Sequence, residues 1–312
     1  MDRKQILNRI ARIALLVILI PPLLLFVVGA LANIFGFADL RVSDRQITEK
    51  FRGVIPGGEV IRNFPGEGFQ LAYVCRPATT ATAHTAIFYV HGSPGGMDAN
   101  TDYLLDSLLS AQATQYTYDR VGYGSSLPLR GEGDMSVQAA QLAALIRHVG
   151  AEQNILVGHS LGCTIAAFLA AAEPQLIDGI VLVAAPLDPV LEPSSWWRPI
   201  LDFPVLRLGI PTAMRISNHE LAPLKSELLD NAGQWDKIRC RVTLIHGDQD
   251  DLVSVRNVDF IRQRFTHAAD VKEVILEHAG HFIYWSREDV VRGEILQMIE
   301  AVSGHPQQTD AN

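Results

Sequence analysis

The chain is poor in cysteine and lacks the spacings that hold a metal ion. Its 312 residues include only three cysteines, Cys75, Cys163 and Cys240, which show no C-x-x-C pattern. We expect small buried side chains at these positions, although the sequence leaves a Cys75–Cys240 disulfide open. Internal repeats and low-complexity tracts are absent too. The cysteine spacing therefore predicts no metal site, and the oligomeric state stays open.

Charged residues are few, and the chain has no net positive charge. They make up 19% of the chain against 48% hydrophobic residues, and the net charge is -8. This balance argues against disorder and provides for a sizeable core. Positions 1–12 hold four basic residues against one acidic residue, a net charge of +3, so the remainder is more acidic than the total. An acidic body disfavours nucleic acid as a partner.

The N-terminal region does contain a long apolar run. Residues 13–32 carry no charge, which is enough to cross a hydrocarbon core as a helix that Pro21 and Pro22 would kink. With the basic flank 1–12 before it, the run predicts a single-pass membrane anchor that places the body outside the cytoplasm. The alternative is a signal peptide cleaved near Ala32, after which the body is exported.

Strand and helix patterns alternate along most of the remaining chain. Residues 33–59 are interpreted as a connector, 60–302 as one domain and 303–312 as a polar tail. Such alternation is typical of an α/β fold, with a mostly parallel sheet covered by helices on both faces. The expected strands are 70–74, 85–90, 115–118, 155–157, 179–184, 242–246 and 271–276. The expected helices lie near 103–111, 136–149, 161–172 and 256–265, followed by a last helix capped by Ser286 with Asp289.

The alternation stops between about residues 187 and 235, where prolines and apolar side chains gather. An insertion at this point would lie over the carboxyl ends of the strands, where ligands bind in such folds. We interpret it as a short helical lid and take Trp196, Trp197 and Phe203 as candidate substrate-binding residues. The alternative is a packed surface excursion without substrate contact.

A G-x-S-x-G pentapeptide stands at residues 158–162. It follows the apolar run 155–157 and precedes the Ala-rich stretch 163–172. Between a strand and a helix, this pattern predicts a sharp turn that exposes Ser160 as a nucleophile. A serine nucleophile needs a general base, a group that orients the base, and donors for the oxyanion.

Loops after two later strands supply the missing groups. His281 follows Gly280 beyond the last strand and is the candidate base, with His278 at the strand terminus as its rival. Asp248, Asp250 and Asp251 follow the preceding strand, and one of them would fix the imidazole and stabilise the imidazolium. The resulting order along the chain is serine, acid, histidine.

In these features, residues 60–302 resemble the serine hydrolase branch of the α/β-hydrolase superfamily, which includes esterases and lipases. Residues 91–95 are similar to its H-G-x-P loop, residues 119–126 to its D-x-x-G-x-G-x-S turn, and residues 247–250 to its G-x-x-D segment. The resemblance implies Asp250 as the acid and the backbone amides of Leu161 and Ser93 as oxyanion donors. His91 and His159 are interpreted as structural.

The resemblance implies a hydrolase that cleaves carboxylic esters through an acyl-Ser160 intermediate without metal or organic cofactor. The apolar lid and the predicted membrane anchor indicate an acyl or lipid-like substrate. Epoxide hydrolases and haloalkane dehalogenases of this superfamily use an aspartate nucleophile, so Ser160 argues against both. Other activities on the same triad are an acyltransferase, a peptidase resembling proline iminopeptidase, or a cofactor-free haloperoxidase. A non-catalytic binding protein that retains the fold is the alternative of another class.

Overall fold

The structure is a computed structural model that describes residues 42–55, 60–80, 84–193 and 196–304, with 26–31 and the single positions 5, 15, 20, 23 and 24. The predicted basic flank 1–12, span 13–32 and tail 303–312 lie largely outside these residues, as does part of the connector 33–59. In the part of the chain that is described, no helix has the length and apolarity needed to cross a membrane.

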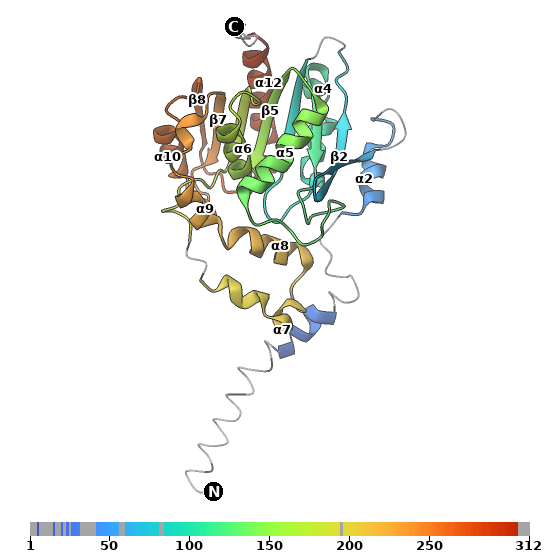
Figure 1. Ribbon diagram of the computed structural model, residues 1–312, viewed down its shortest axis with the longest axis vertical. Helices are drawn as coiled ribbons and strands as arrows, with labels where there is room; N and C mark the ends of the chain where they lie inside the picture. Colours follow the sequence, from blue (N-terminus) through green and yellow to red (C-terminus); the bar gives the residue numbers. More distant parts are fainter. Residues whose placement is uncertain are drawn as a thin grey trace.

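An eight-stranded sheet forms the centre of the described residues (Figure 1). Its strand order is β1-β2-β4-β3-β5-β6-β7-β8; β1 and β2 run antiparallel to their neighbours and the other pairs are parallel. The strands are β1 Ile61–Gly66, β2 Phe69–Arg76, β3 Thr85–Val90, β4 Thr114–Tyr118, β5 Gln153–His159, β6 Gly179–Val183, β7 Arg241–Gly247 and β8 Asp270–Leu276.

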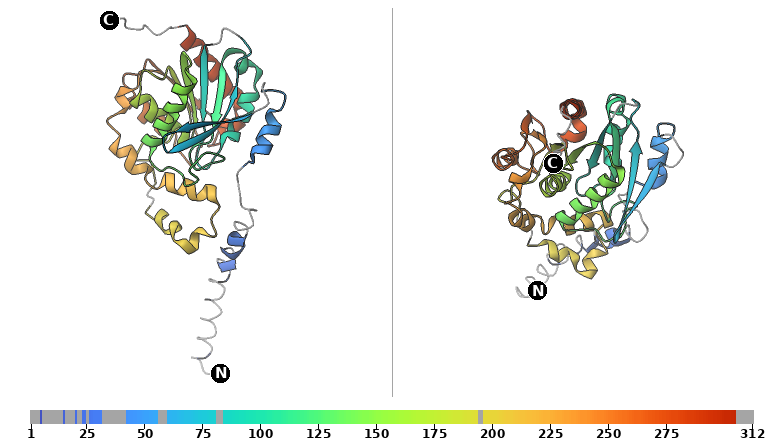
Figure 2. Two further views of the ribbon diagram at one scale, coloured as in Figure 1. Left: turned by 45° about the vertical axis from the view of Figure 1, so that its right-hand side comes forward. Right: turned by 45° about the horizontal axis from the view of Figure 1, so that its top comes forward.

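Helices cover both faces of this sheet (Figure 2). On one face, α5 (Met135–Val149), α6 (Leu161–Ala172) and α10 (Asn257–Arg264) contribute to one apolar cluster. On the other face, α2 (Asp44–Phe51), α3 (Thr101–Leu105), α4 (Ser107–Gln112) and α12 (Glu288–Ser303) contribute to a second. Every residue of β3 and β6 is buried because helices pack on both sides. The predicted α/β class with a mostly parallel sheet is confirmed.

The stretch after β6 folds into short helices below the carboxyl ends of the parallel strands (Figure 1). This stretch, called the lid here, holds η2 (Arg198–Asp202), α7 (Pro204–Arg207), α8 (Thr212–Leu221), α9 (Leu224–Asp230) and η3 (Trp235–Lys237). Residues 26–31 approach it, since a side chain built on Gly29 would lie 2.9 Å from the carbonyl oxygen of Gly209.

All predicted strands are present within two residues of their expected ends, but several other details were wrong or missed. The helix expected over 103–111 is split into α3 and α4, because Asp106 caps α4 through bonds to the amides of Leu108 and Leu109. Ser286 does not cap the last helix; it ends α11 (Ile283–Ser286), and Arg287 precedes α12 without a side-chain cap. Strand β1 was missed.

Helix α2 was also missed, in the segment taken as a connector. Its sequence signal is a capping box: the amide of Gln46 donates to the Ser43 hydroxyl, and the amide of Ser43 donates to the Gln46 side chain. The three cysteines are free and buried, so no disulfide joins Cys75 to Cys240.

Helix α6 lies so close to the sheet that its first turn has no room for a side chain at Gly162. A Cβ there would collide with the carbonyl oxygen of Val90 at the end of β3. We expect Gly162→Ala to lower the free energy of unfolding by about 3 kcal/mol, because the backbone must move to accept it.

Gly293→Ala in α12 is the matched control, since a Cβ at Gly293 would meet nothing within 4 Å. It should raise stability by about 0.5–1 kcal/mol through helix propensity. Urea unfolding of both variants measures the difference, and equal effects would contradict the packing argument.

Candidate active site

Ser160 occupies the sharp turn between β5 and α6. Its backbone has φ 52° and ψ -125°, a positive φ that is strained for a residue with a side chain. The amide of Ser160 donates to the carbonyl of Val183 over 2.9 Å, which fixes the turn to β6. The flanking Gly158 is required here, because a Cβ would lie 2.7 Å from the amide nitrogen of Cys163. The turn therefore has the geometry of a nucleophile elbow.

Asp250 and His281 are brought together from the loops after β7 and β8. The Nδ1 atom of His281 lies 2.8 Å from Oδ2 of Asp250, and both side chains are buried. The other oxygen of Asp250, Oδ1, accepts hydrogen bonds from the backbone amides of Leu252 and Val253 at 2.9 and 2.8 Å. With a carboxylate at Nδ1, the neutral imidazole carries its proton there and leaves Nε2 free to accept another.

The carboxyl of Asp250 is held in its anionic form. Burial acts to raise its pKa, but hydrogen bonds from His246, His281 and the amide of Val253 outweigh burial and keep the pKa well below its usual range. Asp248 and Asp251 are exposed on the same turn. Only Asp250, of the three candidates, bonds a histidine of the site.

His246 also lies against Asp250, and it was not predicted from the sequence as a site residue. Its Nε2 lies 2.9 Å from the carbonyl of Val253 and 3.4 Å from Oδ2 of Asp250. The only available signal was its position four residues before Asp250. The rival base, His278, is exposed and bonds Gln249 over 3.0 Å instead of a carboxylate.

The elbow lies beside His281, although no hydrogen bond joins Ser160 Oγ to the imidazole within the described residues. His159, the residue before Ser160, places its ring 5.0 Å from that of His281 and its Nε2 3.3 Å from the His281 carbonyl. Burial lowers the pKa of His159 to about 3, so this ring is neutral. The three residues predicted as a triad thus come from neighbouring loops.

The loop 91–95 faces the elbow from β3. A Cβ on Gly92 would lie 3.2 Å from that of Ser160. His91 holds the loop: its Nδ1 donates to the carbonyl of Gly92 over 2.8 Å, and its Nε2 accepts the amide of Arg120 over 3.1 Å. Burial, then Arg120, keeps the pKa of His91 well below its usual range. This agrees with the structural role predicted for His91.

The amides of Leu161 and Ser93, predicted as oxyanion donors, have no acceptor among the described residues. The hydroxyl of Ser93, in contrast, is engaged: it donates to Oε2 of Glu220 over 2.6 Å. Two uncommitted amides on the elbow and on the loop beside it are what an oxyanion site requires.

Glu220 belongs to the lid helix α8 and is fully buried. It forms an ion pair with Arg120, and it accepts hydrogen bonds from the hydroxyl of Tyr123 over 2.8 Å and from the side-chain Nε2 of Gln138 over 3.3 Å. Burial acts to lower the pKa of Arg120, but Glu220 outweighs it and raises that pKa. Arg120 also donates to the carbonyl of Gly92 over 2.8 Å. The lid is therefore bonded to the loop that carries Ser93.

The lid aromatics predicted to bind substrate lie on the surface. The exposed fractions are 76% for Trp196, 42% for Trp197 and 64% for Phe203. The guanidinium carbon of Arg198 lies over the ring of Trp197, 5.0 Å from the ring centroid. Among the described residues, no hydrogen bond or ring contact joins any of the three to Ser160, Asp250 or His281. Nor do the described residues contain a group of three or more side chains able to hold a metal ion.

A family model described as the alpha/beta hydrolase fold matches residues 85–209. Among curated proteins, the dihydrolipoyllysine-residue acetyltransferase component of the acetoin cleaving system from Cupriavidus necator is 29% identical over 47% of this chain. The match covers 40% of that relative's length, so this chain corresponds to less than half of it.

Two solved structures are similar over most of the chain. Lip1 of Acinetobacter baumannii, designated a lipase, has a TM-score of 0.61 and 17% identity over 85% of this chain and 98% of its own. A bacterial membrane phospholipase A has a TM-score of 0.58 and 18% identity over 97% of this chain and 100% of its own. At these identities, the likeness shows the fold.

The buried pair Arg120–Glu220 gives a prediction for stability. Glu220→Gln keeps the shape of the side chain but leaves the Arg120 guanidinium buried without a counter-charge. We expect the free energy of unfolding to fall by about 3–5 kcal/mol.

Glu173→Gln is the control for this change. It removes the partner of Arg147, whose side chain is 58% exposed, and should cost less than about 1 kcal/mol. Urea denaturation of both variants measures the effects, and a loss in Glu220→Gln no larger than in Glu173→Gln would refute the role given to the buried pair.

Proposed function

Because the chain belongs to the α/β-hydrolase superfamily, we propose that it is a serine hydrolase that cleaves carboxylic esters through an acyl-Ser160 intermediate. The observation that carries the proposal is the 2.8 Å bond between Asp250 and His281 Nδ1 beside the strained turn of Ser160. A serine on such a turn, next to an oriented imidazole, is the arrangement that activates a hydroxyl.

In the proposed first step, Ser160 Oγ attacks the ester carbonyl and its proton passes to Nε2 of His281. The anionic carboxylate of Asp250 stabilises the imidazolium that forms. The amides of Leu161 and Ser93 donate to the negative oxygen of the tetrahedral intermediate. The intermediate collapses with loss of the alcohol, which takes the proton from His281, and leaves the acyl group on Ser160.

In the second step, water attacks the acyl carbonyl and gives a proton to His281. The second tetrahedral intermediate releases the carboxylic acid, and the proton returns from His281 to Ser160. Every proton is thus carried by one imidazole. The step needs no metal or organic cofactor.

The proposal includes an acyl or lipid-like substrate and attachment to a membrane through residues 13–32. Its support is the uncharged run in the sequence, the large apolar side chains exposed on the lid, and the likeness in fold to a membrane phospholipase A. We further propose that the body lies outside the cytoplasm, with export after cleavage near Ala32 as the alternative.

An acyltransferase is the second candidate, because the curated relative from Cupriavidus necator is named as an acetyltransferase component. Both reactions share the acyl-Ser160 intermediate and differ in the acceptor. Adding an alcohol or a thiol during ester turnover separates them: a transferase passes the acyl group to that acceptor, whereas a hydrolase releases free acid.

The nucleophile assignment predicts labelling of the full chain by a fluorophosphonate probe at Ser160. Ser160→Ala should abolish labelling. Asp250→Asn should slow it by about 10⁴, since the imidazole loses the carboxylate that fixes its tautomer. Asp248→Asn, on the same turn but exposed, is the matched control and should label like the wild type. Equal labelling of Ser160→Ala, or equal losses in the two aspartate variants, would disprove the assignment.

The lipid-like substrate predicts a preference among p-nitrophenyl esters. Octanoate should be cleaved with a kcat/KM at least about tenfold above acetate, since each buried methylene contributes roughly 0.8 kcal/mol. Steady-state kinetics on a series of acyl chains measures this. A preference for acetate would remove the lipid-like substrate but leave the serine hydrolase intact.

A further inference from the structure

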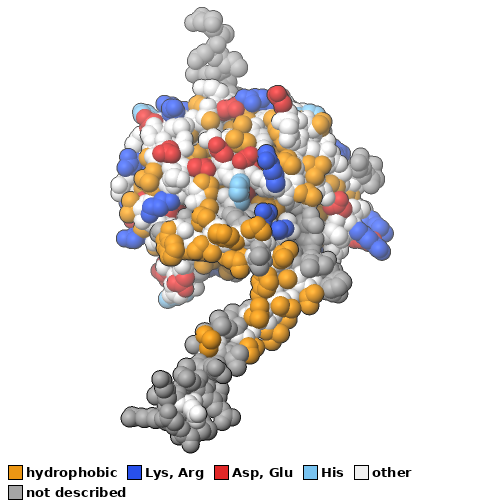
Figure 3. All heavy atoms as spheres, turned by 60° about the horizontal axis from the view of Figure 1, so that its bottom comes forward, with side chains coloured by type: hydrophobic (Ala, Val, Ile, Leu, Met, Phe, Trp, Pro, Cys, Tyr) orange, Lys and Arg blue, Asp and Glu red, His pale blue; other side chains and the backbone are white. Residues whose placement is uncertain are grey.

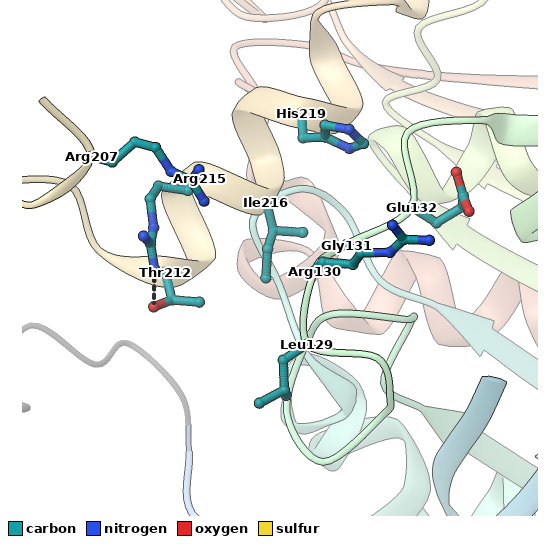
Figure 4. A pocket seen from close by; sticks show the side chains of 9 residues that line it. All are labelled: Leu129, Arg130, Gly131, Glu132, Arg207, Thr212, Arg215, Ile216 and His219. Carbon is teal, nitrogen blue, oxygen red and sulfur yellow. Dashed lines mark hydrogen bonds between the residues drawn. The ribbon is translucent and has the colours of Figure 1, made fainter. Parts of the chain in front are cut away.

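A cavity of about 430 Å³ lies between the lid and the loop that follows β4, and Ser160, Asp250 and His281 do not line it (Figure 4). Arg207 and Arg215 reach it from the lid, and Arg130 reaches it from the loop on the other side. We call it the arginine pocket. Nothing in the proposed ester chemistry uses these three side chains.

The arginine pocket holds more positive charge than the protein neutralises. None of the three arginines forms an ion pair with a carboxylate of the described residues. Glu132 is the single carboxylate in the wall, and its Oε1 accepts the amide of Asp134 over 3.1 Å. His219 lines the pocket as well and adds no negative charge.

Arg215 is the residue most clearly prepared for a ligand. Its Nη2 donates to the hydroxyl of Thr212 over 2.9 Å, while its Nε is buried without a hydrogen-bond partner. Burial, followed by repulsion from Arg207, lowers the pKa of Arg215. A buried donor left unpaired is unfavourable, and an anion bound by both side chains would reduce the repulsion between the two guanidinium groups.

Apolar surface surrounds this cationic pocket. The lid side chains next to Arg207 are exposed: Leu206 by 38% and Leu208 by 52%. Leu129, in the pocket wall, is exposed by 53%. Figure 3 shows hydrophobic side chains over this face of the molecule and along the described part of the N-terminal segment, residues 26–31, beside it. Residues 26–31 contact the lid directly, since a Cβ on Gly209 would lie 2.9 Å from the ring of Phe26.

We propose that the arginine pocket binds a phosphate group, and that the surrounding apolar surface favours one carried by an anionic phospholipid. Guanidinium groups bind phosphate oxygens in pairs, which suits the two adjacent arginines of the lid. The acyl chains of the same lipid would cover the exposed leucines. This site is separate from the ester-cleaving residues and does not depend on their activity.

The test uses the full chain in a neutral detergent with Ser160→Ala in every sample, so that lipid is not consumed. Native mass spectrometry measures the apparent Kd for phosphatidylglycerol and for zwitterionic phosphatidylcholine. Adding Arg207→Gln with Arg215→Gln should weaken phosphatidylglycerol binding at least about tenfold, because the charge-assisted hydrogen bonds to the phosphate are lost. Arg264→Gln, on α10 away from the pocket, is the control and should bind like the parent.

Competition with inorganic phosphate distinguishes the sources of the phosphate group. Phosphatidylglycerol binding that phosphate does not displace supports a lipid site. Phosphate binding that is lost in the double variant, without lipid binding, supports a site for the free anion. If the double variant binds both probes as the parent does, or the parent binds neither, the proposal is overturned.

The melting temperature of the double variant shows whether it folds. If it does not, a second variant tests the proposal. Arg215→Lys keeps the charge but loses the paired donors and the buried Nε. It should bind the phosphate probe with an affinity between that of the parent and the double variant. Unchanged affinity in Arg215→Lys would remove Arg215 from the site.

Discussion

The close approach of helix α6 to the ends of β3 and β5 is the constraint on which the rest of the structure depends. The elbow at Ser160 accepts a positive φ only because Gly158 and Gly162 allow backbone to touch backbone. This contact fixes the serine at the carboxyl edge of the sheet. It also sets the distance to the loop 91–95, since Gly92 lies against Ser160.

Buried charge is arranged around this edge in two separate ways. Asp250 is stabilised as an anion by two backbone amides and two histidines, so it can hold an imidazolium without itself taking a proton. Glu220 is instead neutralised by Arg120 and ties the lid to the loop 91–95 through the hydroxyl of Ser93. A lid joined by a fully buried ion pair cannot move away without exposing both charges. It therefore acts as part of the wall of the site.

The outer side of the lid has a different chemistry from its inner side. Its aromatic side chains, Trp196 and Phe203 among them, are exposed, and the arginines of α7 and α8 gather in one pocket. Exposed apolar surface is unfavourable in water, and here it lies beside cations without a carboxylate partner. A phospholipid matches both, because its acyl chains cover the apolar surface and its phosphate binds the cations. The proposed ester chemistry lies on the inner side of the lid and the proposed lipid contact on its outer side.

Local patterns in the sequence predicted seven of the eight strands, the mostly parallel α/β class, and Ser160 and His281 as candidate site residues, because each depends on a few neighbours in the chain. The choice of Asp250 among three neighbouring aspartates came from the family resemblance. A glycine pair permits an elbow, and a polar residue after a strand lies at the sheet edge. Only the tertiary structure paired Arg120 with Glu220, a hundred residues later, added His246 to Asp250, turned the lid aromatics outward and gathered three arginines in one pocket. These contacts join segments far apart in the chain, and their energies depend on burial and on partners that no local pattern encodes.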